Sequence, residues 1–227
     1  DMHGESLGLF TDNTPTNSSL IPEIDSHIYV WENTLTDGSI PSFEGENGIS
    51  WATTGAGWFG AGIMSIQPAN LSNFSDGFLK FRIKIPQNIS FQIGIIDAWG
   101  NQSYVDFPAS QTTYGLVRDG NWGQASIPIN DIRGELIDLR MLSYEFVILE
   151  VNGVSCEFAL DDIYWDGGIS ETLIGDVNND GFLNVVDVVS IVSIILDNDD
   201  YNSSADYNSD GVVNVIDIIA IVDMIIR

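Results

Sequence analysis

Residues 176–187 read DVNNDGFLNVVD, and residues 206–217 read DYNSDGVVNVID thirty positions later. Both stretches of twelve residues place an oxygen-bearing side chain at positions 1, 3, 5, 9 and 12, and a glycine at position 6. A calcium loop has this spacing, because the ion takes about six to eight oxygen ligands and the glycine permits the sharp turn at mid-loop. The tandem repeat therefore predicts two calcium sites rather than two solvated acidic turns.

The predicted ligands are the side chains at these five positions and the backbone carbonyl at position 7, which is an apolar residue in both loops. In the first loop they are Asp176, Asn178, Asp180, Phe182, Asn184 and Asp187. In the second loop they are Asp206, Asn208, Asp210, Val212, Asn214 and Asp217.

An apolar segment ends each loop and continues beyond it. Residues 185–196 are interrupted only by Asp187, Ser190 and Ser193, and residues 215–226 have corresponding breaks at every third position. This spacing predicts helices with one narrow polar stripe and apolar residues elsewhere. Because a unit of about fifty residues has little core in which to bury such helices, we expect exposed apolar surface and a binding partner.

With these features, residues 175–227 resemble a dockerin, the duplicated calcium-loop module that binds a cohesin domain. The resemblance includes Asp at position 12 and a loop with its following helix, repeated without a full preceding helix. In dockerins, positions 10 and 11 help to select the cohesin, which implies a partner-binding role for Val185, Val186, Val215 and Ile216. Many dockerins carry small polar pairs there, so the identity of the cohesin stays open, as does packing of this surface on the preceding domain.

The charge of the chain limits its partners. There are 33 acidic and 7 basic residues, for a formal net charge of −26. Residues 1–170 carry a net charge of −16, from 22 acids and 6 bases, and residues 171–227 carry −10, from 11 acids and 1 base. Such a surface repels phosphate groups, so nucleic acid and anionic membranes are poor candidates as partners.

Two further features bear on the compartment. Cys156 is the only cysteine, which excludes a disulfide within the chain, and its strand-like surroundings predict a buried, inert thiol. We find neither an apolar span of about 18 residues nor a signal peptide. The calcium loops and the dockerin resemblance imply a secreted protein that is extracellular or attached to the cell surface.

The part of the chain before the repeat predicts strands. In residues 78–85 apolar side chains alternate with Lys80, Arg82 and Lys84, so that one face points inward and the other toward solvent. No helical period appears before Val185. Many short strands separated by turns predict a β-sandwich over residues 1–166, followed by a linker at 167–174 and an all-α unit at 175–227.

Residues 7–166 resemble the galactose-binding-like β-sandwiches, of jelly-roll type, that serve as carbohydrate-binding modules beside secreted glycoside hydrolases. The resemblance rests on residues 7–10, 58–63, 79–81, 122–129 and 158–165. It implies that the chain is the accessory C-terminal part of a glycoside hydrolase and that a polysaccharide is its ligand. It also implies a third calcium ion, held by Asp161 or Asp162 with Asp12, Glu44 or Glu46 opposite.

Sugar rings pack their C–H faces on aromatic side chains, while fixed polar groups bind their hydroxyls. Trp58 lies among glycines and Trp99 lies in a polar turn, so we expect both rings to be exposed. Together with Tyr104 they form the predicted carbohydrate contacts. Arg118 is the expected polar anchor, because its planar guanidinium can bind two hydroxyls. Further candidate aromatic residues are Trp51, Phe59, Tyr114 and Trp122.

Three tryptophans are assigned to the core. Trp31 and Trp165 lie within predicted strands, and core is the favoured position for Trp122, which precedes a strand and matches a structural tryptophan of the fold that the chain resembles.

Nothing in the sequence predicts catalysis. Neighbouring carboxylates such as Asp161 and Asp162 point to opposite faces of a strand and do not serve one cleft, and His3 and His27 lack partner motifs. We therefore predict a non-catalytic protein whose sandwich binds polysaccharide and whose C-terminal unit binds a cohesin in a calcium-dependent way. Two alternatives stay open: the sandwich is a polysaccharide-active enzyme, or it is only a structural support for the dockerin.

Overall fold

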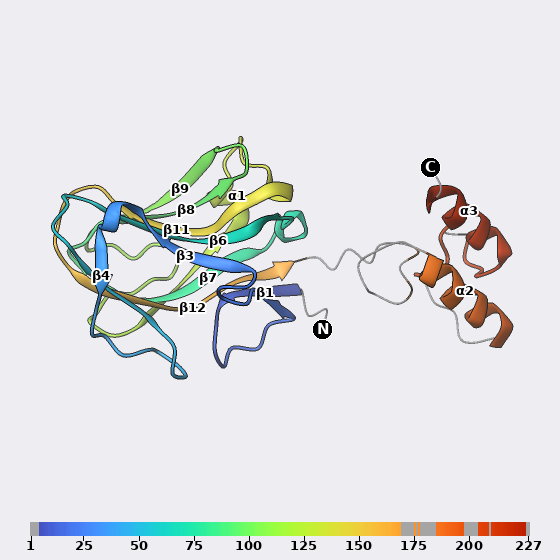
Figure 1. Cartoon of the computed structure of the whole chain (residues 1–227), viewed down its shortest axis with the longest axis horizontal. Coiled ribbons are helices and arrows are strands. Elements are labelled where there is room, and N and C mark those ends of the chain that lie inside the picture. Colours follow the sequence, from blue (N-terminus) through green and yellow to red (C-terminus); the bar gives the residue numbers. More distant parts are fainter. Residues whose placement is uncertain are drawn as a thin grey trace. The chain divides into compact units, whose positions relative to one another are not determined.

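The computed structural model describes residues 5–168, 175, 177, 185–197, 204–208 and 210–225. The chain divides into two units, residues 1–170 and residues 171–227. The first unit is built from two β-sheets, and the described part of the second contains two helices (Figure 1).

Seven strands form the first sheet. Their order is β10-β7-β12-β1-β2, and β12 also pairs with β5, which in turn pairs with β4. Only the β1–β2 pair is parallel among these described strands. The strands are β1 (Glu5–Phe10), β2 (Ser18–Ser19), β4 (Leu35–Asp37), β5 (Ile49–Thr53), β7 (Phe78–Lys84), β10 (Gly123–Pro128) and β12 (Glu157–Gly168).

Five antiparallel strands form the second sheet, in the order β3-β6-β11-β8-β9. They are β3 (Ser26–Val30), β6 (Phe59–Ala69), β8 (Phe91–Asp97), β9 (Gln102–Phe107) and β11 (Leu142–Glu150). Short helical segments connect the strands, namely η1 (Trp31–Asn33), η2 (Ser72–Phe74), α1 (Ile129–Ile132) and η3 (Leu139–Met141).

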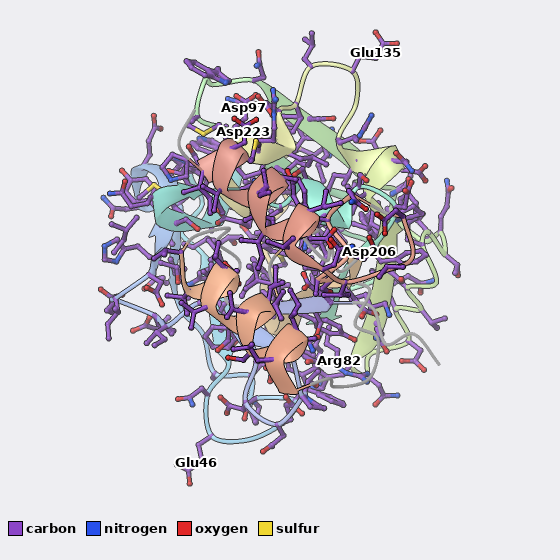
Figure 2. All side chains as sticks on the ribbon, turned by 90° about the vertical axis from the view of Figure 1, so that its right-hand side faces the viewer. Glu46, Arg82, Asp97, Glu135, Asp206 and Asp223 are labelled. Carbon is purple, nitrogen blue, oxygen red and sulfur yellow. The ribbon has the colours of Figure 1, made fainter. Side chains whose placement is uncertain are left out.

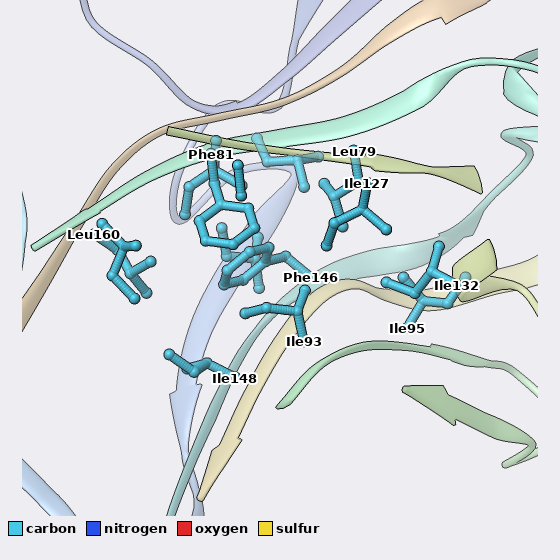
Figure 3. Close-up of a cluster of buried hydrophobic side chains, with 14 of the residues drawn as sticks. Leu79, Phe81, Ile93, Ile95, Ile127, Ile132, Phe146, Ile148 and Leu160 are labelled. Atoms are coloured by element: carbon cyan, nitrogen blue, oxygen red, sulfur yellow. The ribbon is translucent and has the colours of Figure 1, made fainter. Parts of the chain in front are cut away.

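The two sheets pack face to face because their strands alternate apolar and polar side chains. Leu79 and Phe81 of β7 are fully buried. Figure 3 shows them beside Phe146 and Ile93 of the other sheet, and the ring centroids of Phe81 and Phe146 are 5.4 Å apart. Trp165 is also fully buried, as predicted, and its Nε1 donates a hydrogen bond to the Glu145 carbonyl. The predicted β-sandwich is confirmed.

Cys156 is less buried than expected: its side chain is only partly buried. Desolvation, reinforced by the nearby Glu150 carboxylate, raises the pKa of the thiol to about 11. The thiol is therefore protonated at neutral pH and chemically inert, although it is not part of the closed core.

The second unit contains α2 (Val185–Asp197) and α3 (Val215–Ile225). Its fully buried apolar residues in the described part are Ile191, Ala205 and Ile221. The hydroxyls of Ser190 and Ser193 donate hydrogen bonds to the carbonyls four residues earlier in α2, at 3.1 Å each. The hydroxyls in the polar stripe of α2 are thus hydrogen-bonded to the backbone of the same helix. No helix in the described ranges has the length and apolar character that would span a membrane.

Glu145 of β11 is a carboxyl group enclosed by the sandwich. It is fully buried and lies where the pairing register with β6 shifts between Tyr144 and Phe146. Its Oε2 accepts a hydrogen bond from the Ser65 backbone amide at 3.1 Å, whereas Oε1 has no partner among the described residues. Desolvation dominates and raises the pKa of Glu145 to about 7.

This raised pKa makes the stability of the sandwich depend on pH. The carboxyl group is protonated in both states below its unfolded value of 4.5, and above that value the unfolded chain ionises more readily. We expect this group to lower the free energy of unfolding by about 3 kcal/mol as pH rises from about 4.5 to about 7. Glu145→Gln should remove this loss, as measured by urea denaturation across that range. The matched control Glu135→Gln alters an exposed side chain (Figure 2), so its free energy of unfolding should fall with pH as steeply as that of the wild type. The same dependence of the free energy of unfolding on pH in all three proteins would contradict the prediction.

Candidate functional site

The outer face of the five-stranded sheet has a row of residues with two tyrosines at its ends. The strand register aligns Tyr29 of β3, Gly62 of β6, Val147 of β11, Gly94 of β8 and Tyr104 of β9. Because adjacent strands lie about 4.8 Å apart, the row crosses about 19 Å of sheet. Two of its three inner positions are glycines, so no side chain of these two residues occupies the space above the sheet.

Aromatic rings fill the space above these glycines. A Cβ atom on Gly94 would collide with the ring of Tyr104. A Cβ atom on Gly62 would lie 2.8 Å from Cδ1 of Tyr144 and 3.2 Å from Cη2 of Trp31. Glycine is required at both positions because the rings approach the backbone too closely for any side chain.

Trp31 and Trp58 extend this surface over β6. A Cβ atom on Gly60 would lie 2.8 Å from Cε3 of Trp31 and 2.9 Å from Cζ3 of Trp58. The ring centroid of Trp31 is 5.5 Å from that of Tyr144 and 6.2 Å from that of Tyr29. We call the five side chains of Tyr29, Trp31, Trp58, Tyr104 and Tyr144 the aromatic face.

The backbone after β3 holds Trp31 in place. Glu32 and Asn33 have φ values of 50° and 53°, in the left-handed region that non-glycine residues rarely adopt. The Thr34 hydroxyl donates to the Trp31 carbonyl at 2.9 Å and accepts from the Gly60 amide at 3.2 Å. A strained turn of this kind persists only where its surroundings fix it. The position of the Trp31 ring is therefore set by the fold.

The assignment of Trp31 to the core is wrong. Its side chain is partly exposed and lies on the outer face of the sheet, together with Tyr29. The sequence contained a signal for this position. Side chains of an extended segment alternate between its two faces, so Tyr29 and Trp31 point to one face and Ile28 and Val30 to the other. Tyr29 and Tyr144 were also missed, since an aromatic residue in a strand suggests core when its strand's orientation is not known.

The predicted contacts fall in different places. Trp58 and Tyr104 belong to the aromatic face. Trp99 is 71% exposed, as expected for a turn residue, and lies between β8 and β9 with its amide donating to Asp97 Oδ1 at 2.9 Å. It therefore lies at the end of the sheet, outside the row.

Arg118 is not available as a polar anchor. Its side chain is buried, with 7% of the residue exposed, and its guanidinium lies 5.6 Å from the ring centroid of Phe91. Nη1 donates to the Ile89 carbonyl at 2.6 Å, and Nη2 donates to the carbonyls of Pro108 and Gln111. Arg118 thus ties loop backbones together, which corrects its expected role.

The other candidate aromatic residues lie away from this face. Trp51 and Phe59 are core residues, and Tyr114 packs against the core. Trp122 is partly exposed rather than buried, with its ring centroid 5.9 Å from that of Phe43.

Polar groups border the aromatic face at β8 and β9. Gln92 Nε2 donates to Asp106 Oδ1 at 2.8 Å, and the Tyr104 hydroxyl donates to Gln102 Oε1 at 2.9 Å. Burial raises the pKa of Tyr104, so its hydroxyl stays protonated at neutral pH. Apolar rings flanked by amide, carboxylate and phenol groups can bind a molecule that has both apolar faces and hydroxyls.

The second unit contains the repeated acidic loops. In the first loop the predicted ligands Asp176, Asn178, Asp180, Phe182 and Asn184 lie outside the described residues. Its remaining ligand, Asp187, is fully buried, and its Oδ1 accepts a hydrogen bond from the Val177 amide at 3.1 Å.

All six predicted ligands of the second loop are described. Asp217 is fully buried and accepts hydrogen bonds from the amides of Asn208 at 3.1 Å and Asn214 at 2.8 Å. Asp206 is 4% exposed and accepts from the amides of Asp210 at 3.0 Å and Gly211 at 2.8 Å. Gly211, at loop position 6, has a φ of 86°, which a turn of this kind requires.

The donor set of the second loop fits a hard cation. It offers three carboxylates, two amide groups and a backbone carbonyl, in a unit with 11 acids and 1 base. Buried carboxylates such as Asp217 are normally paired with a cation or bound to a metal. Within the described ranges, no three Asp, Glu, His or Cys side chains are gathered as a metal centre, and the loop carboxylates accept hydrogen bonds from backbone amides.

Asp161 and Asp162, the residues of β12 that are expected to help hold a third calcium ion, have partners within the sandwich. Asp161 is fully buried, and its Oδ2 accepts from the amides of Phe43 at 2.7 Å and Glu44 at 3.2 Å. Desolvation raises the pKa of Asp161. Asp162 is paired with Arg82 at 3.3 Å. These carboxylates bind a loop backbone and the Arg82 side chain, and a third calcium ion at this place stays a prediction.

A family model described as carbohydrate binding domain 30 matches residues 10–167. Two crystal structures of family 30 carbohydrate-binding modules align with the chain at 17% identity each. One has a TM-score of 0.52 and covers 71% of this chain and 98% of that one, and the other has a TM-score of 0.50 and covers 63% and 79%. The family 30 module of a cellulosomal cellulase from Clostridium thermocellum aligns at 18% identity with a TM-score of 0.48, over 63% of this chain and 87% of that one. None of the curated proteins matches the chain.

Proposed function

The chain belongs to the carbohydrate binding domain 30 family through residues 10–167, and we propose that its aromatic face is the surface that binds polysaccharide. The sandwich is a non-catalytic polysaccharide-binding module. The observation that supports this surface is the row from Tyr29 to Tyr104, with Trp31 and Tyr144 above its glycines. Rings of this kind take the C–H faces of sugars, and the polar pairs at Gln92 and Gln102 are placed to bind hydroxyls.

The row also favours a particular way of binding. It crosses the sheet from the edge strand β3 to the edge strand β9, so a bound molecule can continue beyond both edges. This suits an internal stretch of an extended chain. The net charge of −16 in residues 1–170 favours a neutral polysaccharide over an anionic one.

A glycan array with the purified chain tests the proposal, with a reducing-sugar assay run on every glycan that binds. We expect retention on extended neutral polysaccharides and no release of reducing ends. Release of reducing ends would instead support the enzyme alternative, and the absence of any bound glycan would support a purely structural sandwich.

We propose further that residues 175–227 are a dockerin with two calcium ions, which attaches the sandwich to a cohesin. Support comes from the two loops thirty positions apart and from the buried carboxylates at position 12 of each, Asp187 and Asp217. Bound calcium would replace backbone amides as the main partner of these oxygens and fix the loop against its helix. The protein would then be secreted, extracellular or attached to the cell surface, as the accessory part of a glycoside hydrolase.

The proposed cohesin surface is formed by Val185, Val186, Val215 and Ile216, which are 67%, 52%, 60% and 55% exposed. Replacing Val185 and Val186 by Asp should leave binding nearly intact, because the second repeat offers an equivalent surface. Replacing all four should weaken binding at least about 100-fold, because several desolvated contacts are lost together. Isothermal titration against a panel of cohesins measures both variants.

The same variants test whether this surface packs on the sandwich instead. In that case the fourfold variant would melt at a lower temperature than the wild type with no partner present. A fourfold variant that captures the same cohesin and keeps the wild-type melting temperature would contradict both roles.

A further inference from the structure

The seven-stranded sheet has a break along one edge of β12. Residues 157–160 of β12 pair with β5, and residues 163–168 pair with β1, both on the side opposite β7. Asp161 and Asp162 lie between these two pairings, and Asp162 has a φ of 52°. The end of β1 and the beginning of β5 are therefore separated on the same edge of the sheet.

A pocket of about 730 Å³ lies where these two strand ends face each other. Core side chains form its floor, namely Leu9, Ile49 and Trp51, which are 2%, 6% and 9% exposed. Ile21 and Ile28 line it as well and are 51% and 38% exposed. Small-molecule sites typically have volumes of about 300–1,000 Å³, so this pocket has the size of a ligand site.

The rim of the pocket is fixed by hydrogen bonds between two loops. Asp12 Oδ2 accepts from the amides of Glu46 and Asn47, and Oδ1 accepts from Asn47 Nδ2, all at 3.0 Å. In return, Glu44 Oε1 accepts from the amides of residues 13 and 14 at 2.9 and 3.0 Å. Because each loop holds the other, the pocket is formed before any ligand binds, which reduces the entropy cost of binding.

The lining combines apolar and hydrogen-bonding groups. Asp12, Asp37, Asn47 and Ser50 contribute polar atoms above the aliphatic and aromatic floor. The carboxylate of Asp37 is exposed and has no ion pair with the described residues. Asp12, Asp37 and Glu46 are the acidic residues of the lining, and Figure 2 shows the Glu46 side chain extending outward from its loop.

This lining matches a molecule with apolar C–H faces and many hydroxyls. Carboxylate and amide oxygens accept hydrogen bonds from hydroxyl groups, and the floor accepts C–H faces. Three acidic residues in the lining, within a unit with a net charge of −16, disfavour an anionic ligand. A mainly apolar ligand would use only the floor and would make no hydrogen bond to the exposed polar groups of the rim.

We infer that this pocket is a second carbohydrate site, which binds a chain end or a short side branch of a neutral saccharide. The core closes it below, whereas the aromatic face crosses the sheet to both edges. The inference goes beyond the proposed function of the aromatic face and does not require it, because the two sites share no residue. An organic cation, attracted by Asp12 and Asp37, is the competing occupant.

The test uses the full chain with Trp31→Ala and Tyr104→Ala, so that binding by the aromatic face is weakened, and with isotope-labelled isoleucine methyl groups. The probes are neutral monosaccharides and hexasaccharides of glucose, galactose, mannose and xylose, together with n-hexylammonium. We expect saturable NMR shifts of the Ile21, Ile28 and Ile49 methyls with at least one sugar.

A matched pair of variants locates the site. Ile21→Trp places a large ring in the pocket and should weaken sugar binding at least about 10-fold. Ile24→Trp changes a nearby isoleucine that is 66% exposed and does not line the pocket, so it should leave the affinity unchanged. Asp37→Asn should weaken binding about 5-fold, because a charged acceptor is lost.

The inference is overturned if no sugar shifts the three methyl signals or if only n-hexylammonium shifts them. It is also overturned if Ile21→Trp and Ile24→Trp change the affinity for the sugar equally. Failure of the aromatic face is a separate result. If the aromatic face does not bind polysaccharide, Trp31→Ala in the otherwise wild-type chain leaves the affinity for polysaccharide unchanged. The pocket methyl signals would still shift when sugar is added.

Discussion

Trp31→Ala is expected to lower the affinity of the sandwich for its polysaccharide by about 10- to 100-fold, the effect of removing a ring that contributes about 1–3 kcal/mol in a desolvated contact. The loss has two parts. The Trp31 ring itself no longer contacts the sugar, and Tyr144 loses the neighbour that lies 5.5 Å away and helps to orient it. Isothermal titration with a polysaccharide identified on the array measures the affinity, and calorimetry confirms that the variant is folded.

Two other tryptophans provide controls for this experiment. Trp122 is also partly exposed, but it lies directly before β10 of the other sheet and contacts Phe43, so Trp122→Ala should leave the affinity unchanged. Trp99 is 71% exposed at the end of the five-stranded sheet, and Trp99→Ala should lower the affinity by only about 2- to 5-fold. If Trp122→Ala abolishes binding while Trp31→Ala does not, the polysaccharide lies on the seven-stranded sheet.

The second large effect concerns the C-terminal unit. Asp187→Ala with Asp217→Ala should abolish the helical signal that the wild-type unit gains when calcium is added. Both carboxylates are fully buried and end their loops at equivalent positions, so each is placed to bind an ion and to hold the start of its helix. Calcium at about 1,000 times its dissociation constant would stabilise the folded unit by about 4 kcal/mol, and the double variant should lose this gain.

Circular dichroism in calcium and in chelator measures this effect. Asp223→Asn is the control, because Asp223 is an exposed carboxylate of α3 outside both loops, and it should respond to calcium like the wild type. A wild-type chain whose helical signal and melting are the same in calcium and in chelator would refute the calcium proposal. A double variant that is unfolded while the wild type ignores calcium would show that the two carboxylates serve only as acceptors for backbone amides.

Strand positions could be predicted from the sequence where one face is buried. In β7 the alternation of Leu79, Phe81 and Ile83 with charged residues fixes both the strand and the direction of its side chains. The order of the strands depends on contacts between distant segments. For example, β12 pairs with β1 and β5 at one edge, and no local pattern specifies this.

The candidate site was predicted only in part, for a related reason. Trp58 and Tyr104 were identified because glycines and polar residues surround them. Trp31 was not, because its exposure depends on Gly60 and Gly62, which lie on another strand and leave room for the ring above the sheet. Arg118 was misassigned because the carbonyls that it binds come from loops up to 29 residues away.

The hydrogen bonds of Ser190 and Ser193 to their own helix have a practical consequence. A hydroxyl that is already paired with a backbone carbonyl interacts less with water, so α2 presents a drier surface than its composition suggests. Within the described residues this surface is left exposed to solvent, with Val189 60% and Leu196 77% exposed. Solubility would then rest on the strong negative charge of the unit, and salt that screens this charge should favour self-association.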